Sequence, residues 1–213
     1  MATVSRISSI YDSYLRKAPR QSRSRSVVEA ILGAATERLS RSGNEEELTL
    51  QEVANRAGVG IGSVYDYFSD RRSILAALAV KSTQDNLRAF EALLESAHEL
   101  PLDESVGQVV DFCFETYTSN KRVPRAVLKV AHTIGLMPTL AQSQTVFAES
   151  LAASLRKRQD IGVPDIDLAA WTVTQAMMGV IQTLVWQDEP KHSETELRAE
   201  LIALFGAHLR GRV

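Results

Sequence analysis

The sequence predicts an all-α protein of about nine helices. Apolar residues recur at spacings of three and four through most of the 213-residue chain, which is the period of an amphipathic helix. No segment alternates apolar and polar residues as a half-buried strand would, and no internal repeat is evident. Hydrophobic residues make up 45% of the chain and aromatic residues only 6%, so the core is expected to be built from Ala, Leu and Val, a composition that favours helices.

The first helix is expected to begin after Ser26, whose hydroxyl can cap it, and to run to about Ser42. Its apolar stripe consists of Val27, Ile31, Ala34, Ala35 and Leu39. Gly43 and Asn44 end this helix, and a short acidic loop, Glu45–Glu47, follows.

The next segment, residues 49–72, predicts two short helices joined by a glycine turn. Thr49 and Glu52 have the spacing of a capping box, so a helix is expected to begin at Leu50 and to end at Gly58. A second helix is expected from Ile61 to about Phe68. Its buried stripe would be Ile61, Val64 and Phe68, which leaves Gly62, Ser63, Asp66 and Tyr67 on the opposite side and Tyr65 at the boundary.

This layout is that of a helix-turn-helix, in which the second helix enters the major groove of DNA. Small side chains let the helix backbone approach the duplex, tyrosine hydroxyls can contact phosphates, and a carboxylate can accept from cytosine N4. An ordinary helical hairpin is the alternative, but the cap, the turn, the apolar stripe and the polar face together favour DNA binding. The expected DNA contacts are Thr49, Gly60, Gly62, Ser63, Tyr65, Asp66, Tyr67, Arg71, Arg23 and Arg25.

The net charge of −2 conceals an asymmetry between the two parts of the chain. Residues 1–81 hold 12 Lys and Arg against 9 Asp and Glu, whereas the remainder holds 12 against 17. Five cations and no acid fall within residues 14–25. A basic stretch beside a helix-turn-helix indicates phosphate or minor-groove contact, with a solubilising tail as the alternative.

After this segment the helical period continues to the end of the chain. Ser69 or Asp70 is expected to cap a helix that directs Ile74, Leu75, Leu78 and Ala79 inward. Further helices are predicted at 83–98, 103–119, 124–135, 143–159, 165–187 and 194–210, with breaks at glycine and proline. Another capping box, Ser193 with Glu196, marks the start of the last helix.

The helix over 165–187 is apolar on most faces, so it is either a central core helix or a dimer interface. One broad face of this helix gathers Trp171, Gln175, Met178, Gly179, Gln182 and Trp186. Phe147, Leu151 and Leu155 are the candidates for a partner helix in such an interface.

No catalytic, metal or cofactor site is expected. The single Cys113 excludes a disulfide framework and a multi-cysteine zinc site, and the four histidines lack metal spacing. The glycine run from Gly58 to Ser63 lacks the third glycine and the preceding strand of a dinucleotide-binding loop. Cys113 is expected to be an inert buried thiol, with redox sensing as the alternative. No secretory signal or membrane-length apolar run is expected, which predicts a cytosolic protein.

The segment over residues 49–75 resembles the TetR-type bacterial regulators. It shares with them Thr49, Val53, Ala54, Ala57, Gly58, Val59, Gly62, Ser63, Val64, Tyr65, Tyr67, Phe68 and Leu75. It departs from the family pattern at Gly60, where Ser is frequent, and at Arg71, where Lys is usual.

The resemblance implies a basic arm over 1–24, a DNA-binding domain over 25–70 and a helical ligand-binding and dimerisation domain over 71–213. It further implies a homodimer on a palindromic operator, released by a small-molecule effector that is expected to be hydrophobic. Residues that could line an effector cavity, each of which could equally be plain core, are Phe90, Phe112, Tyr117, His132, Met137 and Met177. A helical module that has lost DNA binding and an all-α enzyme remain the alternative classes.

Overall fold

The computed structural model describes residues 15–212, and its regular structure is entirely helical over that range. Nine α-helices and one 3-10 turn occur among these residues, in agreement with the prediction of an all-α chain with about nine helices. The chain forms two compact units. The first comprises the residues up to Asp85 together with Asn120–Thr139, and the second comprises Asn86–Ser119 and Leu140 onward. Residues 1–14 of the predicted arm lie outside the described range.

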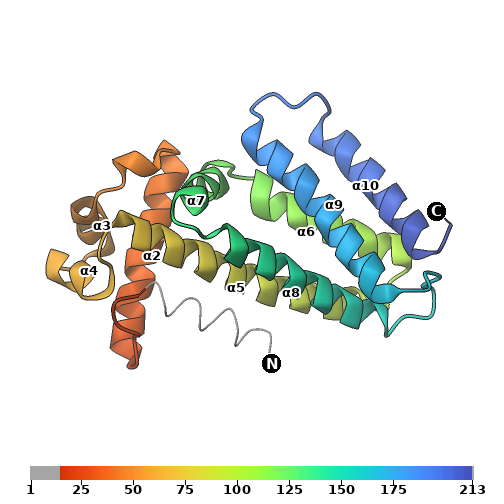
Figure 1. The fold of residues 1–213 in the computed structure, drawn as a ribbon, viewed down its shortest axis with the longest axis horizontal. Helices are drawn as coiled ribbons and strands as arrows, with labels where there is room; N and C mark the ends of the chain where they lie inside the picture. Colours follow the sequence, from red (N-terminus) through yellow and green to blue (C-terminus); the bar gives the residue numbers. More distant parts are fainter. Residues whose placement is uncertain (1–14, 213) are drawn as a thin grey trace. The chain divides into compact units, whose positions relative to one another are not determined.

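The first unit contains α2 (Ser22–Ser42), η1 (Glu45–Glu47), α3 (Leu50–Ala57), α4 (Ile61–Tyr67), the first part of α5 (Arg71–Ala97) and α7 (Arg122–Thr133). Figure 1 shows α2, α3 and α4 grouped together in this unit. Its core takes Ile31 and Leu39 from α2, Val53 from α3, and Val64 and Phe68 from the segment of α4. Each of these side chains is almost completely buried. Burial of a side chain such as Phe68 contributes about 2–3 kcal/mol.

The second unit contains the rest of α5, α6 (Leu102–Thr118), most of α8 (Met137–Leu155), α9 (Ile166–Trp186) and α10 (Glu194–Leu209). α6 packs against both α9 and α10. The predicted capping box at the start of α10 is confirmed in both directions, because Ser193 accepts from the amide of Glu196 and the Glu196 carboxylate accepts from the amide of Ser193.

Several predicted helix boundaries were wrong. α2 begins at Ser22, four residues before the predicted cap, so Arg23 and Arg25 are helical. Residues 71–97 form one helix rather than two because no glycine or proline interrupts them. α8 begins at Met137 rather than at 143. Pro138 is tolerated there, since the first turn of a helix needs no amide donor.

α7 and α8 each end earlier than predicted, at Thr133 and Leu155. Asp70 is confirmed as the cap of α5, because its Oδ1 accepts from the amide of Ser73 at 2.8 Å. By length and apolar composition alone, α9 could cross a membrane, so the expectation that no apolar segment reaches that length was wrong.

Candidate nucleic-acid interface

The turn between α3 and α4 forms as the sequence predicts. Thr49 Oγ1 accepts from the amide of Glu52 at 3.2 Å and caps α3. Gly58 follows α3 with a φ of 68°, a conformation that only glycine adopts at no steric cost. The amides of Gly58 and Val59 donate to the last carbonyls of α3 at 3.3 and 3.1 Å, which ends the helix and turns the chain into α4.

Only half of the predicted capping box at α3 forms. The carboxylate of Glu52 does not return to the backbone of Thr49, and instead accepts from Arg38 Nε at 2.7 Å. Arg38 also donates to Glu47 at 2.8 Å, and this hydrogen bond holds the pKa of the Glu47 carboxyl below its usual range. Arg38 on α2 therefore forms ion pairs with both Glu47 and Glu52, the acidic residues on either side of Thr49.

The exposed surface of α4 consists of Gly62, Tyr65 and Asp66. The side chain of Tyr65 is 48% exposed, whereas Tyr67 is partly buried and packs against the core. The predicted positions of the two tyrosines were therefore wrong. Successive residues of a helix are 100° apart, so Tyr65 lies about 40° from Ile61 and Tyr67 about 60° from Val64. The helical step alone therefore does not decide which tyrosine is buried, and the packing of α4 on the core does.

Gly62 is not required by the fold of its own chain. Its φ is not positive, and a Cβ added at Gly62 would meet no atom within 4 Å outside its own helix backbone. The same space is open at Gly60, which has the extended conformation of an N-cap. The absence of a side chain at Gly62 leaves the helix backbone accessible to a molecule outside the chain.

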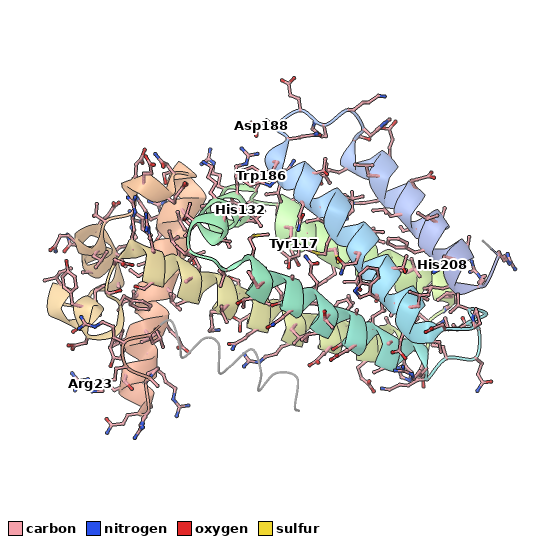
Figure 2. All side chains as sticks on the ribbon, in the orientation of Figure 1. Arg23, Tyr117, His132, Trp186, Asp188 and His208 are labelled. Carbon is pink, nitrogen blue, oxygen red and sulfur yellow. The ribbon has the colours of Figure 1, made fainter. Side chains whose placement is uncertain are left out.

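Exposed arginines surround the first turn of α2. Arg20, Arg23 and Arg25 are all exposed, and Arg25 Nη2 donates to the carbonyl of Arg20 at 3.3 Å. Figure 2 shows Arg23 projecting from this end of α2. Helix N-termini favour acidic side chains, yet the first turn of α2 contains none. Cations at this position are electrostatically unfavourable for the helix and are well placed to contact an external anion.

Arg71 forms a contact within the chain. Its Nη1 donates to the carbonyl of Glu46 at 2.8 Å, so the side chain holds the acidic turn η1 against the start of α5. The neighbouring Arg72 is exposed, although it was not among the predicted contacts. The sequence signal that indicates Arg72 is the adjacent pair Arg71–Arg72, of which only Arg71 was predicted to contact DNA.

The predicted effector residues divide between the two units. His132 is exposed on α7 and Met137 begins α8, both in the first unit. The other four candidates belong to the second unit: Phe90, Phe112, Tyr117 and Met177. The Phe90 ring lies 5.9 Å from that of Phe112 and 5.4 Å from that of Phe147, between centroids.

Two ionisable groups on α6 are strongly perturbed. Burial raises the pKa of the Tyr117 hydroxyl to about 12, although a hydrogen bond from Asn86 at 3.4 Å acts in the opposite direction. Burial also raises the pKa of the Cys113 thiol to about 12. A thiol in this state is a poor nucleophile, which supports the prediction of an inert cysteine, although Cys113 is partly rather than fully buried.

The outer face of α9 is apolar and exposed. Leu168, Trp171 and Trp186 are 60%, 50% and 44% exposed, and Leu204 on α10 is 46% exposed. Of the other predicted interface residues on α9, Gly179 is exposed and the remaining three are partly buried: Gln175, Met178 and Gln182. Trp186 is seen near the C-terminal end of α9 in Figure 2.

The predicted partner residues on α8 were wrong. Leu151 and Leu155 are 6% and 4% exposed within the single chain, and Phe147 packs on Phe90. Leu151 and Leu155 are core residues because the stripe of α8 that carries them faces its own unit, whereas Phe147 is partly buried. Leu204, which was not predicted, occupies the exposed face of α10 instead.

No cluster of three or more His, Cys, Asp or Glu side chains suited to a metal ion occurs among residues 15–212. The geometry of the first unit is that of a helix-turn-helix with an accessible second helix and adjoining cations. This combination defines the class of helix-turn-helix DNA-binding proteins.

Comparison with known proteins agrees with this class. Residues 31–78 match the family described as bacterial regulatory proteins, tetR family, and residues 101–209 match the tetracyclin repressor-like C-terminal domain. An uncharacterized HTH-type transcriptional regulator of Mycobacterium tuberculosis, Rv0472c, is 26% identical over 169 residues, which cover 78% of this chain and 70% of the relative. The chain belongs to the TetR family of transcriptional regulators.

Solved structures show the same fold. A protein from Mesorhizobium loti assigned to the TetR family superposes with a TM-score of 0.72 at 17% identity, covering 89% of this chain and 98% of the other. The TetR family repressor AlkX from Dietzia sp., implicated in biodegradation of n-alkanes, gives 0.61 at 16% identity, covering 92% and 98%. FadR from Bacillus halodurans, a fatty acid degradation regulator, gives 0.57 at 20% identity, covering 85% and 99%.

Proposed function

We propose that this regulator binds a palindromic operator as a homodimer and represses transcription until a small hydrophobic effector releases it. The observation that carries the proposal is the exposed surface of α4. Gly62, Tyr65 and Asp66 all face outward there and are accessible to DNA. The exposed arginines at the start of α2 supply the positive charge that phosphates require.

The proposed DNA contacts divide into two kinds. Tyr65 and the arginines would contact phosphates, whereas Asp66 would accept from a cytosine amino group in the major groove. The complete proposed set is Thr49, Gly60, Gly62, Ser63, Tyr65, Asp66, Arg23, Arg25 and, through its place beside η1, Arg71; Tyr67 is left out because it packs against the core. Arg72 joins this set because it is exposed beside Arg71.

The apolar face of α9 and α10 supports the homodimer. Exposed tryptophans at both ends of one helix are costly in a monomer, whereas aromatic side chains are enriched in protein interfaces. Gly179, in the middle of this face, has open space around it and would let a second helix approach closely. Two copies related by a two-fold axis would match a palindrome with half-sites about 34–36 Å apart or a multiple of that distance.

The proposed effector is hydrophobic because the second unit is rich in aromatic and apolar side chains around Phe90, with the Tyr117 hydroxyl as a polar group. The folds of AlkX and FadR, proteins connected with n-alkane and fatty acid breakdown, are consistent with this class of compound. We assign the protein no catalytic activity and place it in the cytoplasm, where its operator would be.

The test is selection of genomic DNA fragments by the purified full-length protein at about physiological salt, followed by sequencing. One enriched palindromic sequence is expected. Retention of all fragments without an enriched sequence would contradict a sequence-specific regulator. The effector is then sought among long-chain fatty acids and n-alkanes by loss of the selected duplex from the complex.

The role of Asp66 has its own test on the selected duplex. Asp66→Ala is expected to strengthen binding to random DNA, because a carboxylate repels phosphates, and to relax discrimination at one base pair by about 1–3 kcal/mol. Equal weakening on the selected and random duplexes would contradict this role. Competition binding against single-base variants of the duplex measures both quantities.

A further inference from the structure

Arg16 contacts the C-terminal end of α4, although the two are 49 residues apart in the sequence. The backbone amide of Arg16 donates to the carbonyl of Tyr67 at 2.9 Å, and its guanidinium Nη1 donates to the carbonyl of Tyr65 at 3.2 Å. The adjacent Leu15 is only 7% exposed and belongs to the core of the first unit. The arm is therefore attached to α4 by both a buried side chain and hydrogen bonds.

The C-terminus of α4 has no glycine cap of its own. The last four carbonyls of a helix lack partners within that helix. Phe68 follows in an extended conformation with a φ of −129°, and its amide satisfies the carbonyl of Val64 at 2.8 Å. Of the three carbonyls that remain, those of Tyr65 and Tyr67 both accept from Arg16. The guanidinium also lies at the negative end of the helix dipole, where a cation is stabilising.

This contact matters because α4 has only seven residues. A helix of that length is marginal without outside support. The residues proposed to contact DNA, Tyr65 and Asp66, lie in its last turn, at the end that Arg16 holds.

We propose that Arg16 is a positioning residue for the recognition helix: it caps the C-terminal carbonyls of α4 and thereby fixes the direction in which Tyr65 and Asp66 face the groove. The proposal rests on the proposed DNA contacts of α4. It differs from a role in which the arm supplies only positive charge, because a phosphate contact would affect all DNA sequences equally.

The first experiment needs no DNA. Amide hydrogen exchange of full-length Arg16→Ala is compared with that of Lys17→Ala, in which the neighbouring exposed cation is removed. The amides of Tyr65, Tyr67 and Phe68 are expected to exchange about five- to tenfold faster in Arg16→Ala, as the loss of one charge-assisted hydrogen bond implies. They are expected to remain unchanged in Lys17→Ala. Unchanged exchange in both variants would overturn the proposal.

The second experiment measures binding to the duplex selected by the wild-type protein and to a random duplex of equal length, over a range of salt concentrations. Arg16→Ala is expected to lower the ratio of the two affinities about five- to tenfold while the salt dependence stays close to that of the wild type. Lys17→Ala is expected to keep the ratio of the two affinities unchanged. If Lys17 contacts a phosphate, the magnitude of the slope of log affinity against log salt concentration falls by about 0.9 in this variant.

The outcomes separate the two roles of the arm. If Arg16→Ala weakens binding to both duplexes equally and reduces the salt slope, the residue acts as a charge and the proposal is wrong. If Arg16→Ala exchanges faster but keeps the affinity ratio, Arg16 stabilises α4 without orienting it toward DNA. That result also overturns the proposal. If the wild-type protein selects no duplex, the proposed function fails, whereas the exchange experiment still decides whether Arg16 caps α4.

Discussion

Replacing Gly62 by Ala is expected to stabilise the protein and to weaken its binding to DNA. The added Cβ would meet no atom within 4 Å outside its own helix backbone, and the φ of Gly62 is not positive, so the native chain accepts the methyl group without strain. Ala is favoured over Gly in a helix by about 0.5–1 kcal/mol, mainly because Gly loses more backbone entropy on folding. The free energy of unfolding should therefore rise by up to about this amount.

The same methyl group would stand on the exposed surface of α4, where close approach of DNA is proposed. A methyl group added to a close-packed contact costs about 1–3 kcal/mol. That cost corresponds to a fall in affinity of about 5- to 150-fold for the selected duplex. Thermal and urea unfolding measure the first effect, and fluorescence anisotropy with a labelled duplex measures the second.

Gly33→Ala is the matched control, because Gly33 is exposed in the middle of α2 and a Cβ there also meets no atom within 4 Å. It should raise stability by a similar amount and leave DNA binding unchanged. Gly62→Ala binding the duplex as tightly as the wild type would mean that DNA does not approach α4 closely at this residue. Lower stability of that variant would mean that the space around Gly62 is not open.

Trp171→Glu should leave the helical content intact and convert the proposed homodimer into a monomer at micromolar concentration, because it places a charge on the exposed face of α9. Sedimentation equilibrium that still shows a dimer would place the interface elsewhere. Cys113 should react slowly with a thiol reagent at pH 8 and rapidly in guanidinium, because a pKa of about 12 leaves roughly one thiol in ten thousand ionised. Fast labelling of the native protein would mean that the thiolate is accessible. Arg158→Met should lower the free energy of unfolding by about 3 kcal/mol, because this side chain is 6% exposed and donates to carbonyls of the α5–α6 connection. Arg156→Met, which removes an exposed ion pair, should change it by less than about 1 kcal/mol and serves as the control in urea unfolding.

The sequence by itself determined the features that depend on neighbouring residues. The cap at Thr49, the left-handed Gly58, the cap at Asp70 and the capping box at Ser193 all formed as predicted. Each of these rests on interactions within about four residues, so the local sequence contains both partners. The all-helical class followed from apolar periodicity for the same reason.

The continuity of α5 was visible locally, because no glycine or proline occurs over residues 71–97. Arg72 was likewise visible in the sequence as the second member of a cationic pair. The exposure of Tyr65 and the partial burial of Tyr67 were not visible locally, since the 100° step of a helix places each tyrosine within about 60° of an apolar residue of the buried stripe.

Only the tertiary structure decided the contacts between distant segments. The pattern of α8 shows an apolar stripe but does not say whether that stripe faces its own unit, as Leu151 does, or a second chain. The bond from Arg71 to Glu46 spans 25 residues, and the bond from Arg16 to Tyr65 spans 49. Such pairings depend on how the helices pack, and packing is set by the whole core rather than by the residues that form the bond.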